Sequence, residues 1–134
     1  LQSYEKSEID IIESYGYGRG LTSVIHVDGT RYPTANADTY VNAKAVTKKD
    51  WWSRFHVYSV EWDRNQVVFR IDGKETRRIT RDIPVVDYFV VISMLSSDWE
   101  QKRLSDPVRN ANGVTPTRLP QTMTVDWVKA WTPS

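Results

Sequence analysis

Short hydrophobic segments separated by turn-forming residues run through this sequence. The clearest is FHVYSVEWD at 55–63, in which two sets of side chains alternate. Because successive side chains of a β-strand point to opposite faces, this alternation predicts a strand. One face would carry His56, Tyr58, Val60 and Trp62, and the other face Phe55, Val57, Ser59 and Glu61.

The segments after this strand predict a β-hairpin. QVVFRI at 66–71 and KETRRIT at 74–80 flank the dipeptide Asp72-Gly73. Asp-Gly is typical of a two-residue turn in which both central residues have positive φ. We therefore expect the chain to reverse direction at this dipeptide.

Further strands are expected at 8–15, 21–27, 39–46, 88–95 and 122–131. The run YFVVISML at 88–95 is apolar throughout and too short for most helices, which predicts a strand buried on both faces. Loops are expected at 15–20, 30–39 and 96–120, and a loop or short turn at 48–52. About seven or eight short strands and no helical period predict an all-β fold, an antiparallel β-sandwich, in a single domain over 1–134.

Composition adds little to the choice of partner. The chain has 134 residues, 40% of them hydrophobic and 26% charged, which suits one domain with a core of its own. Its net charge of +1 gives no electrostatic reason to expect nucleic acid or an anionic membrane as a partner. The absence of cysteine does not decide between a reducing and an oxidising compartment. No apolar run approaches the ~20 residues that cross a bilayer.

The segment EIDIIE at 8–13 carries three acids, Glu8, Asp10 and Glu13, between isoleucines. In a regular strand Glu8 and Asp10 share one face, whereas Glu13 points to the other. A β-bulge near Ile11-Ile12 would insert one extra residue and bring Glu13 to the face of the other two acids. In that arrangement we expect Ile9 and Ile11 to anchor the strand in the core.

With the bulge, the Cα atoms of Glu8 and Glu13 would lie about 13 Å apart, at ~3.3 Å per strand position. Their carboxyl groups can then approach the ~5–5.5 Å that is typical of a retaining glycosidase. One glutamate would attack the anomeric carbon, and the other would exchange a proton with the leaving oxygen and then with water. Asp10 would hold one glutamate through a shared proton.

The alternative is an acidic strand face that water simply solvates. Two arguments oppose this interpretation. Like charges clustered on one strand face are destabilising, and β-bulges are common next to active sites.

Beyond the acids, the sequence resembles glycoside hydrolase family 16, whose bulge-containing members carry Glu-x-Asp-x-x-Glu. The segments FHVYSVEWDRNQVVFRIDGKE at 55–75 and MTVDWVKAW at 123–131 are similar to later strands of that family. The resemblance implies a concanavalin-like β-jelly-roll with a polysaccharide cleft. By the motif, Glu8 corresponds to the nucleophile, Asp10 to the supporting acid and Glu13 to the general acid/base.

The implied activity is endo-hydrolysis of a β-linked polysaccharide with retention of configuration, and the expected substrate is β-1,3-glucan of the laminarin type. A β-galactanase of the agar or carrageenan type, a transglycosylase, or a carbohydrate-binding sandwich without activity are the alternatives. Two stretches depart from the common laminarinase pattern, LSSDWEQ at 95–101 and SDPVRNANGVTPTRLP at 105–120. This departure affects which polysaccharide the protein is expected to accept. A polymeric substrate implies a secreted protein.

The resemblance suggests roles for three further residues. Trp99 corresponds to a cleft tryptophan whose indole can stack on a sugar, or it caps the edge of the core. His26 corresponds to a histidine on the strand after the catalytic one, either a hydrogen-bond donor in the cleft or a structural histidine. Asp126 corresponds to a structural calcium ligand of many members, or it is an ordinary exposed acid. His56 is interpreted as structural. No cofactor is expected to be required, and a structural calcium at Asp126 is the one ion that the resemblance suggests.

In the family the acidic motif lies near the middle of the domain, whereas here it begins at residue 8. The resemblance therefore covers the C-terminal part of the catalytic jelly-roll. We expect a complementary N-terminal segment or chain to supply the remaining strands and part of the cleft, because unpaired strand edges and an uncovered apolar face would otherwise remain.

Overall fold

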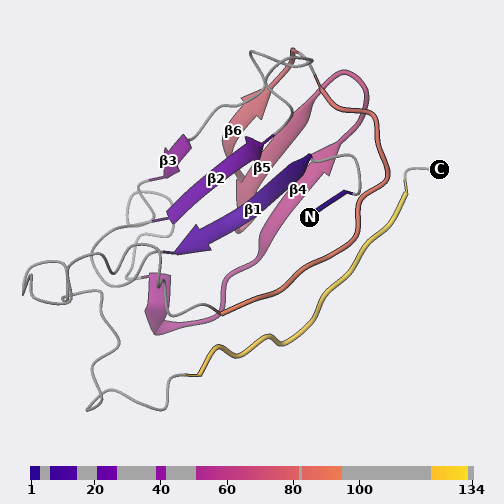
Figure 1. The fold of residues 1–134 in the computed structure, drawn as a ribbon. Coiled ribbons are helices and arrows are strands. Elements are labelled where there is room, and N and C mark those ends of the chain that lie inside the picture. The colour runs from indigo at the N-terminus through magenta and orange to yellow at the C-terminus, as the bar shows by residue number, and fades with distance from the viewer. Residues whose placement is uncertain are drawn as a thin grey trace, which may run out of the picture. The chain divides into compact units, whose positions relative to one another are not determined.

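The computed structural model describes residues 1–3, 7–14, 21–26, 39–41, 51–81, 83–94 and 122–132. The chain divides into two compact units, Leu1–Val91 and Ile92–Ser134, which are described separately. All of the assigned strands belong to the first unit (Figure 1), and among the described residues the one helix is the 3-10 turn η1, Trp51–Ser53. The strands are β1 (Glu8–Ser14), β2 (Leu21–His26), β3 (Thr39–Val41), β4 (Tyr58–Trp62), β5 (Val67–Ile71) and β6 (Lys74–Ile79). The predicted all-β class is confirmed, and the single domain over 1–134 stays a prediction.

The first sheet has the order β1-β2-β3, and both of its strand pairs are antiparallel. The first residues of the chain extend it on the other side of β1. Gln2 forms a bridge to Glu8 and another to Phe89, with backbone N···O distances of 3.0 and 2.9 Å between Gln2 and Phe89. Leu1 accepts a further hydrogen bond from the Ile9 amide at 2.8 Å. These contacts place the start of the chain beside the strand that carries the acids.

The second sheet, β4-β5-β6, is the predicted run of two hairpins. Asp72 and Gly73 have φ values of 51° and 77°, and Ile71 pairs directly with Lys74. The two-residue turn with positive φ at both centres is therefore confirmed. A shift in the β5–β6 register occurs next to Thr76, whose hydroxyl donates a hydrogen bond to the carbonyl oxygen of Phe69 at 3.2 Å.

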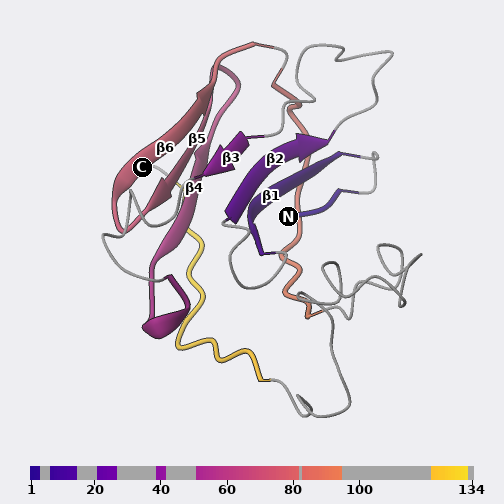
Figure 2. The same ribbon diagram turned by 90° about the vertical axis from the view of Figure 1, so that its left-hand side faces the viewer.

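The core lies between the two sheets, which face each other in Figure 2. One cluster joins Ile9 and Ile25 of the first sheet to Val67, Phe69, Ile79 and Ile83, with Val60 packed against it. A second cluster joins Leu21 to Ile71, with Ile12, Trp51 and Tyr58 at its edge. Each large apolar side chain buried in this way contributes about 1.5–3 kcal/mol. Tyr58 and Val60 both contact the core, as the alternation at 55–63 predicts.

The prediction of a doubly buried strand at 88–95 is wrong for its described part. Among the described residues, only Phe89 of this run pairs, with Gln2, and the side chains from Phe89 to Met94 are exposed. The segment 122–132 likewise contains no strand, and its side chains are exposed. A strand requires neighbouring backbone to pair with, and an apolar, β-branched composition does not provide that neighbour. Residues 15–20, 30–38, 42–50 and 95–121 lie outside the described residues.

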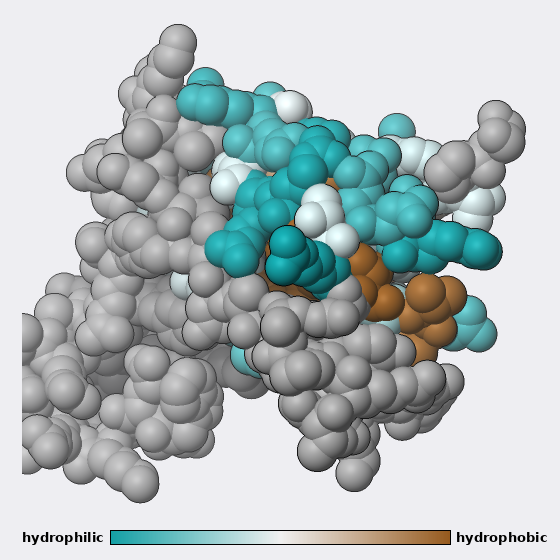
Figure 3. Space-filling view, turned by 90° about the horizontal axis from the view of Figure 1, so that it is seen from above, coloured by the Kyte–Doolittle hydropathy of each residue, from teal (hydrophilic) through white to brown (hydrophobic). Residues whose placement is uncertain are grey.

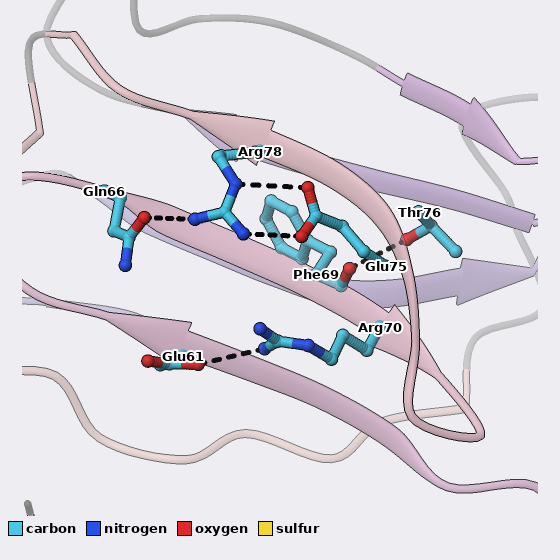
Figure 4. A network of polar contacts seen from close by, with 7 residues as sticks. All are labelled: Glu61, Gln66, Phe69, Arg70, Glu75, Thr76 and Arg78. Carbon is cyan, nitrogen blue, oxygen red and sulfur yellow. Dashed lines mark hydrogen bonds and ion pairs between the residues drawn. The ribbon is translucent and has the colours of Figure 1, made fainter.

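Charged side chains cover the outward face of the second sheet (Figure 4). Arg70 binds Glu61 at 3.0 Å, and Arg78 binds Glu75 through two nitrogen atoms and also contacts Gln66. These residues surround Val68, which pairs with Glu61 and Arg78 and is fully buried although it points away from the core. The aliphatic stems of such side chains exclude water, so the network covers an apolar position. Exposed ion pairs add little stability of their own.

The connection between β4 and β5 lies at the end of the sandwich seen in Figure 3. Hydrophilic side chains form most of the described surface there, beside a smaller hydrophobic group. Asp63 organises the connection, because its carboxylate accepts hydrogen bonds from the amides of Asn65 at 2.6 Å and Gln66 at 2.9 Å.

No helix in the described part of the chain has the length and apolar character needed to span a membrane.

His56 is structural, as interpreted from the sequence. Its ring is fully buried, and Nδ1 lies 2.7 Å from Oδ2 of Asp72 in the hairpin turn. The other carboxylate oxygen of Asp72 accepts a hydrogen bond from the Val57 amide at 3.0 Å. Partial burial raises the pKa of Asp72, but the hydrogen bonds from His56 and Val57 and the charges of His56 and Arg54 outweigh it, so the pKa lies below its usual value.

Replacing Asp72 with Asn is expected to lower the free energy of unfolding at pH 7 by about 1 kcal/mol, because the charged acceptor is lost while left-handed backbone stays tolerated. The side chain is 38% exposed, and solvent screening keeps the effect small. Since the pKa of Asp72 is lowered by folding, its contribution is complete above about pH 4 and is lost as the pH falls through the folded pKa. Urea unfolding at pH 7 and pH 3 measures this difference.

The matched control is Asp87→Asn, which changes an exposed aspartate outside the hairpin. Its unfolding free energy should equal that of the parent protein at both pH values. A D72N variant as stable as the parent at pH 7, or one whose deficit does not shrink at pH 3, would contradict the assignment.

Candidate active site

A β-bulge interrupts the pairing of β1 with β2. Asp10 pairs with Val24 and Glu13 with Thr22, so two residues of β1, Ile11 and Ile12, lie opposite the single residue Ser23. The Ser23 hydroxyl donates a hydrogen bond to the carbonyl oxygen of Ile11 at 2.9 Å. The extra residue leaves backbone groups of β1 without a partner in the regular ladder. The Ser23 hydroxyl satisfies one of them, the carbonyl group of Ile11. The bulge predicted from the doubled isoleucine is confirmed.

The bulge changes which side of β1 each later residue faces. Residues that pair directly on antiparallel strands point to the same face. The pairs Glu8–His26, Asp10–Val24 and Glu13–Thr22 therefore share one face of the first sheet. This face is opposite to the one on which Ile9 and Ile25 enter the core.

The second isoleucine that anchors β1 is not the one predicted. Ile12 packs against the cluster of Leu21 and Ile71, whereas Ile11 is half-buried and belongs to neither cluster of described residues. The reason is the position of the extra residue. Because the change of phase falls before Ile12, its side chain enters the core and Glu13 then turns to the opposite face.

The separation of the two glutamates follows from the register. Glu8 pairs with His26 and Glu13 with Thr22, which are four positions apart on β2. Four strand positions correspond to about 13 Å between backbones, as the sequence predicts. Asp10 lies between the two glutamates on the same face, and all three acids are half-buried.

Asp10 has the most perturbed pKa of the three acids. Its side chain is only 16% exposed, and burial is the largest cause of a pKa raised to about 7. The negative charges of Glu8 and Glu13 and a hydrogen bond with Glu8 raise the pKa further, whereas the charge of His26 lowers it. Near neutral pH Asp10 is therefore protonated in a large share of molecules, and its carboxyl group can donate a hydrogen bond to Glu8.

Glu8 has a second polar partner that the sequence did not reveal. The side-chain amide of Gln2 donates a hydrogen bond to Oε1 of Glu8 at 3.0 Å. Gln2 lies before the first predicted strand, in a segment with no periodic pattern. Its position is fixed by two backbone bridges, one to Glu8 itself and one to Phe89, which is 87 residues away in sequence (89 − 2).

His26 lies on the acidic face, because it pairs directly with Glu8. Its imidazole is 54% exposed, and Nε2 lies 3.4 Å from Oδ2 of Asp10. The structure thus brings together four of the residues singled out in the sequence: Glu8, Asp10, Glu13 and His26. A hydrogen bond from His26 to substrate stays a prediction.

The other two candidates are not joined to this group by the described structure. Trp99 lies outside the described residues. Asp126 is exposed in the second unit. Within the part of the chain that the structure describes, no group of three or more His, Asp or Glu side chains is arranged to hold a metal ion. Calcium binding at Asp126 stays a prediction.

Two glutamates on one strand face, with a protonatable aspartate between them, can supply a nucleophile and a proton donor. The half-buried setting favours this chemistry, because charges interact more strongly away from bulk water. Burial and the charges of Glu8 and Glu13 raise the pKa of Asp10, and shifts of this kind are what acid/base catalysis by neighbouring carboxyl groups depends on.

Comparison with known proteins agrees with this geometry. The family described as Glycosyl hydrolases family 16 matches residues 1–129. Beta-porphyranase B of Zobellia galactanivorans is 28% identical over 79 residues, which are 58% of this chain and 25% of that protein. The match thus spans a quarter of the length of this relative. No solved structure is significantly similar to the chain. With its antiparallel sheets and a family match over residues 1–129, the chain belongs to glycosyl hydrolases family 16.

Proposed function

We propose that this chain carries the catalytic acids of a retaining endo-β-glycosidase, which hydrolyses internal linkages of a β-linked polysaccharide. The observation that supports the proposal is the bulge at Ile11-Ile12, because it turns Glu13 to the face of Glu8 and Asp10. Family membership agrees with a glycoside hydrolase. If the three acids formed only a solvated surface, neither the bulge nor the half-buried position of Asp10 would be needed.

In the proposed first step, a carboxylate oxygen of Glu8 attacks the anomeric carbon. The glycosidic bond breaks, and the leaving oxygen takes the proton of Glu13. In the second step Glu13, now a carboxylate, removes a proton from water as the water oxygen attacks the same carbon. Glu8 leaves as a carboxylate and Glu13 regains its proton, so the configuration at the anomeric carbon is retained.

Asp10 would support the nucleophile. Its hydrogen bond with Glu8, together with the amide of Gln2 on Oε1, orients the Glu8 carboxylate. A proton on Asp10 also removes the charge repulsion that would otherwise disfavour an ionised Glu8. Glu13 lies farther along the strand on the same face, and in the proposed mechanism it donates its proton to the leaving oxygen.

Two substrates are proposed, in order. β-1,3-Glucan of the laminarin type comes first, because the acidic motif resembles that of laminarinase-type enzymes. A β-galactan comes second, and the relationship to a beta-porphyranase favours it. Either polymer is too large to enter a cell, so we propose that the protein is secreted. A complementary N-terminal segment or chain, expected from the resemblance, is part of the same proposal.

Replacing Glu8 or Glu13 with Gln is expected to reduce kcat/KM for the polysaccharide by at least about 10²-fold, because Gln can neither attack nor exchange a proton. Release of reducing ends measures the rate. Glu61→Gln is the matched control, since Glu61 lies on the outward face of the other sheet, and its rate should equal that of the parent protein. If E8Q hydrolyses as fast as an active parent protein, Glu8 is not the nucleophile and the proposal fails. If the parent protein itself releases no reducing ends, the chain is a carbohydrate-binding sandwich.

Azide separates the roles of the two glutamates. With E13A, azide needs no general base and attacks the glycosyl-enzyme, which yields a glycosyl azide of retained β configuration. With E8A, azide takes the place of the missing nucleophile and yields the α-azide. The anomeric coupling constants of the two products, measured by NMR, identify them. The opposite assignment of products would reverse the roles of Glu8 and Glu13.

A substrate panel decides between the two polymers. We expect the protein to release reducing ends fastest from laminarin, with lichenan, agarose, carrageenan and porphyran as comparisons. Early products should be long oligosaccharides, as internal cleavage requires. Hydrolysis of porphyran or agarose with laminarin untouched would replace the glucan by a galactan and leave the catalytic proposal in place.

A further inference from the structure

Ser23 is a polar residue at a position of β2 where the strand pattern predicts an apolar side chain. By alternation it shares a face of the strand with Leu21 and Ile25, and both of these enter the core. Ser23 is as deeply buried as they are, with 1% of its surface exposed. Because a buried hydroxyl without a partner is costly, packing alone does not explain a serine at this position.

The β-bulge explains the serine. The Ser23 hydroxyl donates a hydrogen bond to the carbonyl oxygen of Ile11 at 2.9 Å, at the point where two residues of β1 lie opposite this one residue of β2. The hydroxyl satisfies a carbonyl group that the extra residue removes from the regular ladder, and the carbonyl group satisfies the buried hydroxyl. The hydrogen bond therefore fixes where along β1 the extra residue lies.

The bulge divides the three acids into two groups. Glu8 and Asp10 come before the extra residue and keep a regular register with β2, whereas Glu13 follows it. A register shift of one residue moves every later side chain to the other face of the sheet. The hydrogen bond of Ser23 thus affects the placement of Glu13 and leaves the other two acids where they are.

We propose that Ser23 is a positioning residue for Glu13 in the reaction proposed above: by binding the carbonyl group of Ile11, its hydroxyl holds the bulge in place and keeps Glu13 on the acidic face. This role rests on the proposed function of the acids. Ser23 does not touch substrate or the reacting atoms, because its side chain is buried on the opposite face of the sheet.

Two variants, Ser23→Ala and Ser23→Cys, remove the hydroxyl. Cysteine is a weak donor of nearly the same shape, so S23C weakens the hydrogen bond without opening a cavity. With polysaccharide, whose leaving oxygen needs the proton of Glu13, kcat/KM should fall by about 10–10²-fold in both variants. With a 2,4-dinitrophenyl glycoside of an oligosaccharide from the same polymer, it should change by less than about 3-fold, because this leaving group departs without a proton and Glu8 stays in place.

The matched control is Thr76→Val, which removes the same kind of contact from the sheet that carries none of the three acids. The Thr76 hydroxyl donates a hydrogen bond to the carbonyl oxygen of Phe69 at 3.2 Å, beside a shift in the β5–β6 register. The ratio of the two rates, with polysaccharide and with the dinitrophenyl glycoside, should be the same in T76V as in the parent protein. An equal loss with both substrates in the Ser23 variants, or no loss with polysaccharide, overturns the inference.

Cross-strand nuclear Overhauser effects give a readout that does not depend on activity. In S23A and S23C the effects between Glu13 and Thr22 should weaken, whereas those between Asp10 and Val24 should stay as in the parent protein and show that the strands remain paired. Unchanged effects between Glu13 and Thr22 in both variants overturn the inference. If the parent protein hydrolyses no polysaccharide, the proposed function fails, whereas these effects still decide whether Ser23 holds Glu13 in register.

Discussion

The extra residue in β1 is the constraint on which the rest of the site depends. Two residues, Ile11 and Ile12, share one place in the ladder, and the Ser23 hydroxyl binds the carbonyl oxygen of Ile11 at 2.9 Å. With an unbroken pleat, Glu13 would point toward the core, where an unpaired carboxylate is very costly. With the bulge, Ile12 packs in the core and Glu13 joins Glu8 and Asp10. The bulge thus allows Ile12 to pack in the core and, at the same time, aligns the three acids on the opposite face.

The alignment has an energetic cost that the surroundings offset in part. Three acids on one strand face repel each other, and burial further disfavours the charge on Asp10. The pKa of Asp10 is raised to about 7, the side-chain amide of Gln2 donates a hydrogen bond to Glu8, and Nε2 of the exposed His26 lies 3.4 Å from Oδ2 of Asp10. On the other sheet the opposite arrangement holds, since its outward acids are paired with arginines.

The features that the sequence predicted correctly are those with a local cause. The doubled isoleucine shifts the alternation by one and so predicts the bulge, and Asp72-Gly73 predicts the turn that the φ values confirm. The features it missed depend on distant neighbours. The apolar run at 88–95 has strand composition, yet in the described residues only Gln2 pairs with it. Gln2 contacts Glu8 in a segment without a periodic pattern, where it is bridged both to Glu8 and to the distant Phe89. The choice of Ile12 over Ile11 as the core residue depends on where β2 pairs with β1.

The central claim is that the bulge presents Glu8 as a nucleophile. Trapping the covalent intermediate tests it most directly. An oligosaccharide with fluorine at C2 of its terminal sugar and a good leaving group should react once and release its product slowly, because fluorine destabilises both oxocarbenium-like transition states. Peptide mass spectrometry should then find one sugar ester, on Glu8. An ester on Glu13 or on a carboxylate outside 8–13, in a protein that hydrolyses polysaccharide, would contradict the account.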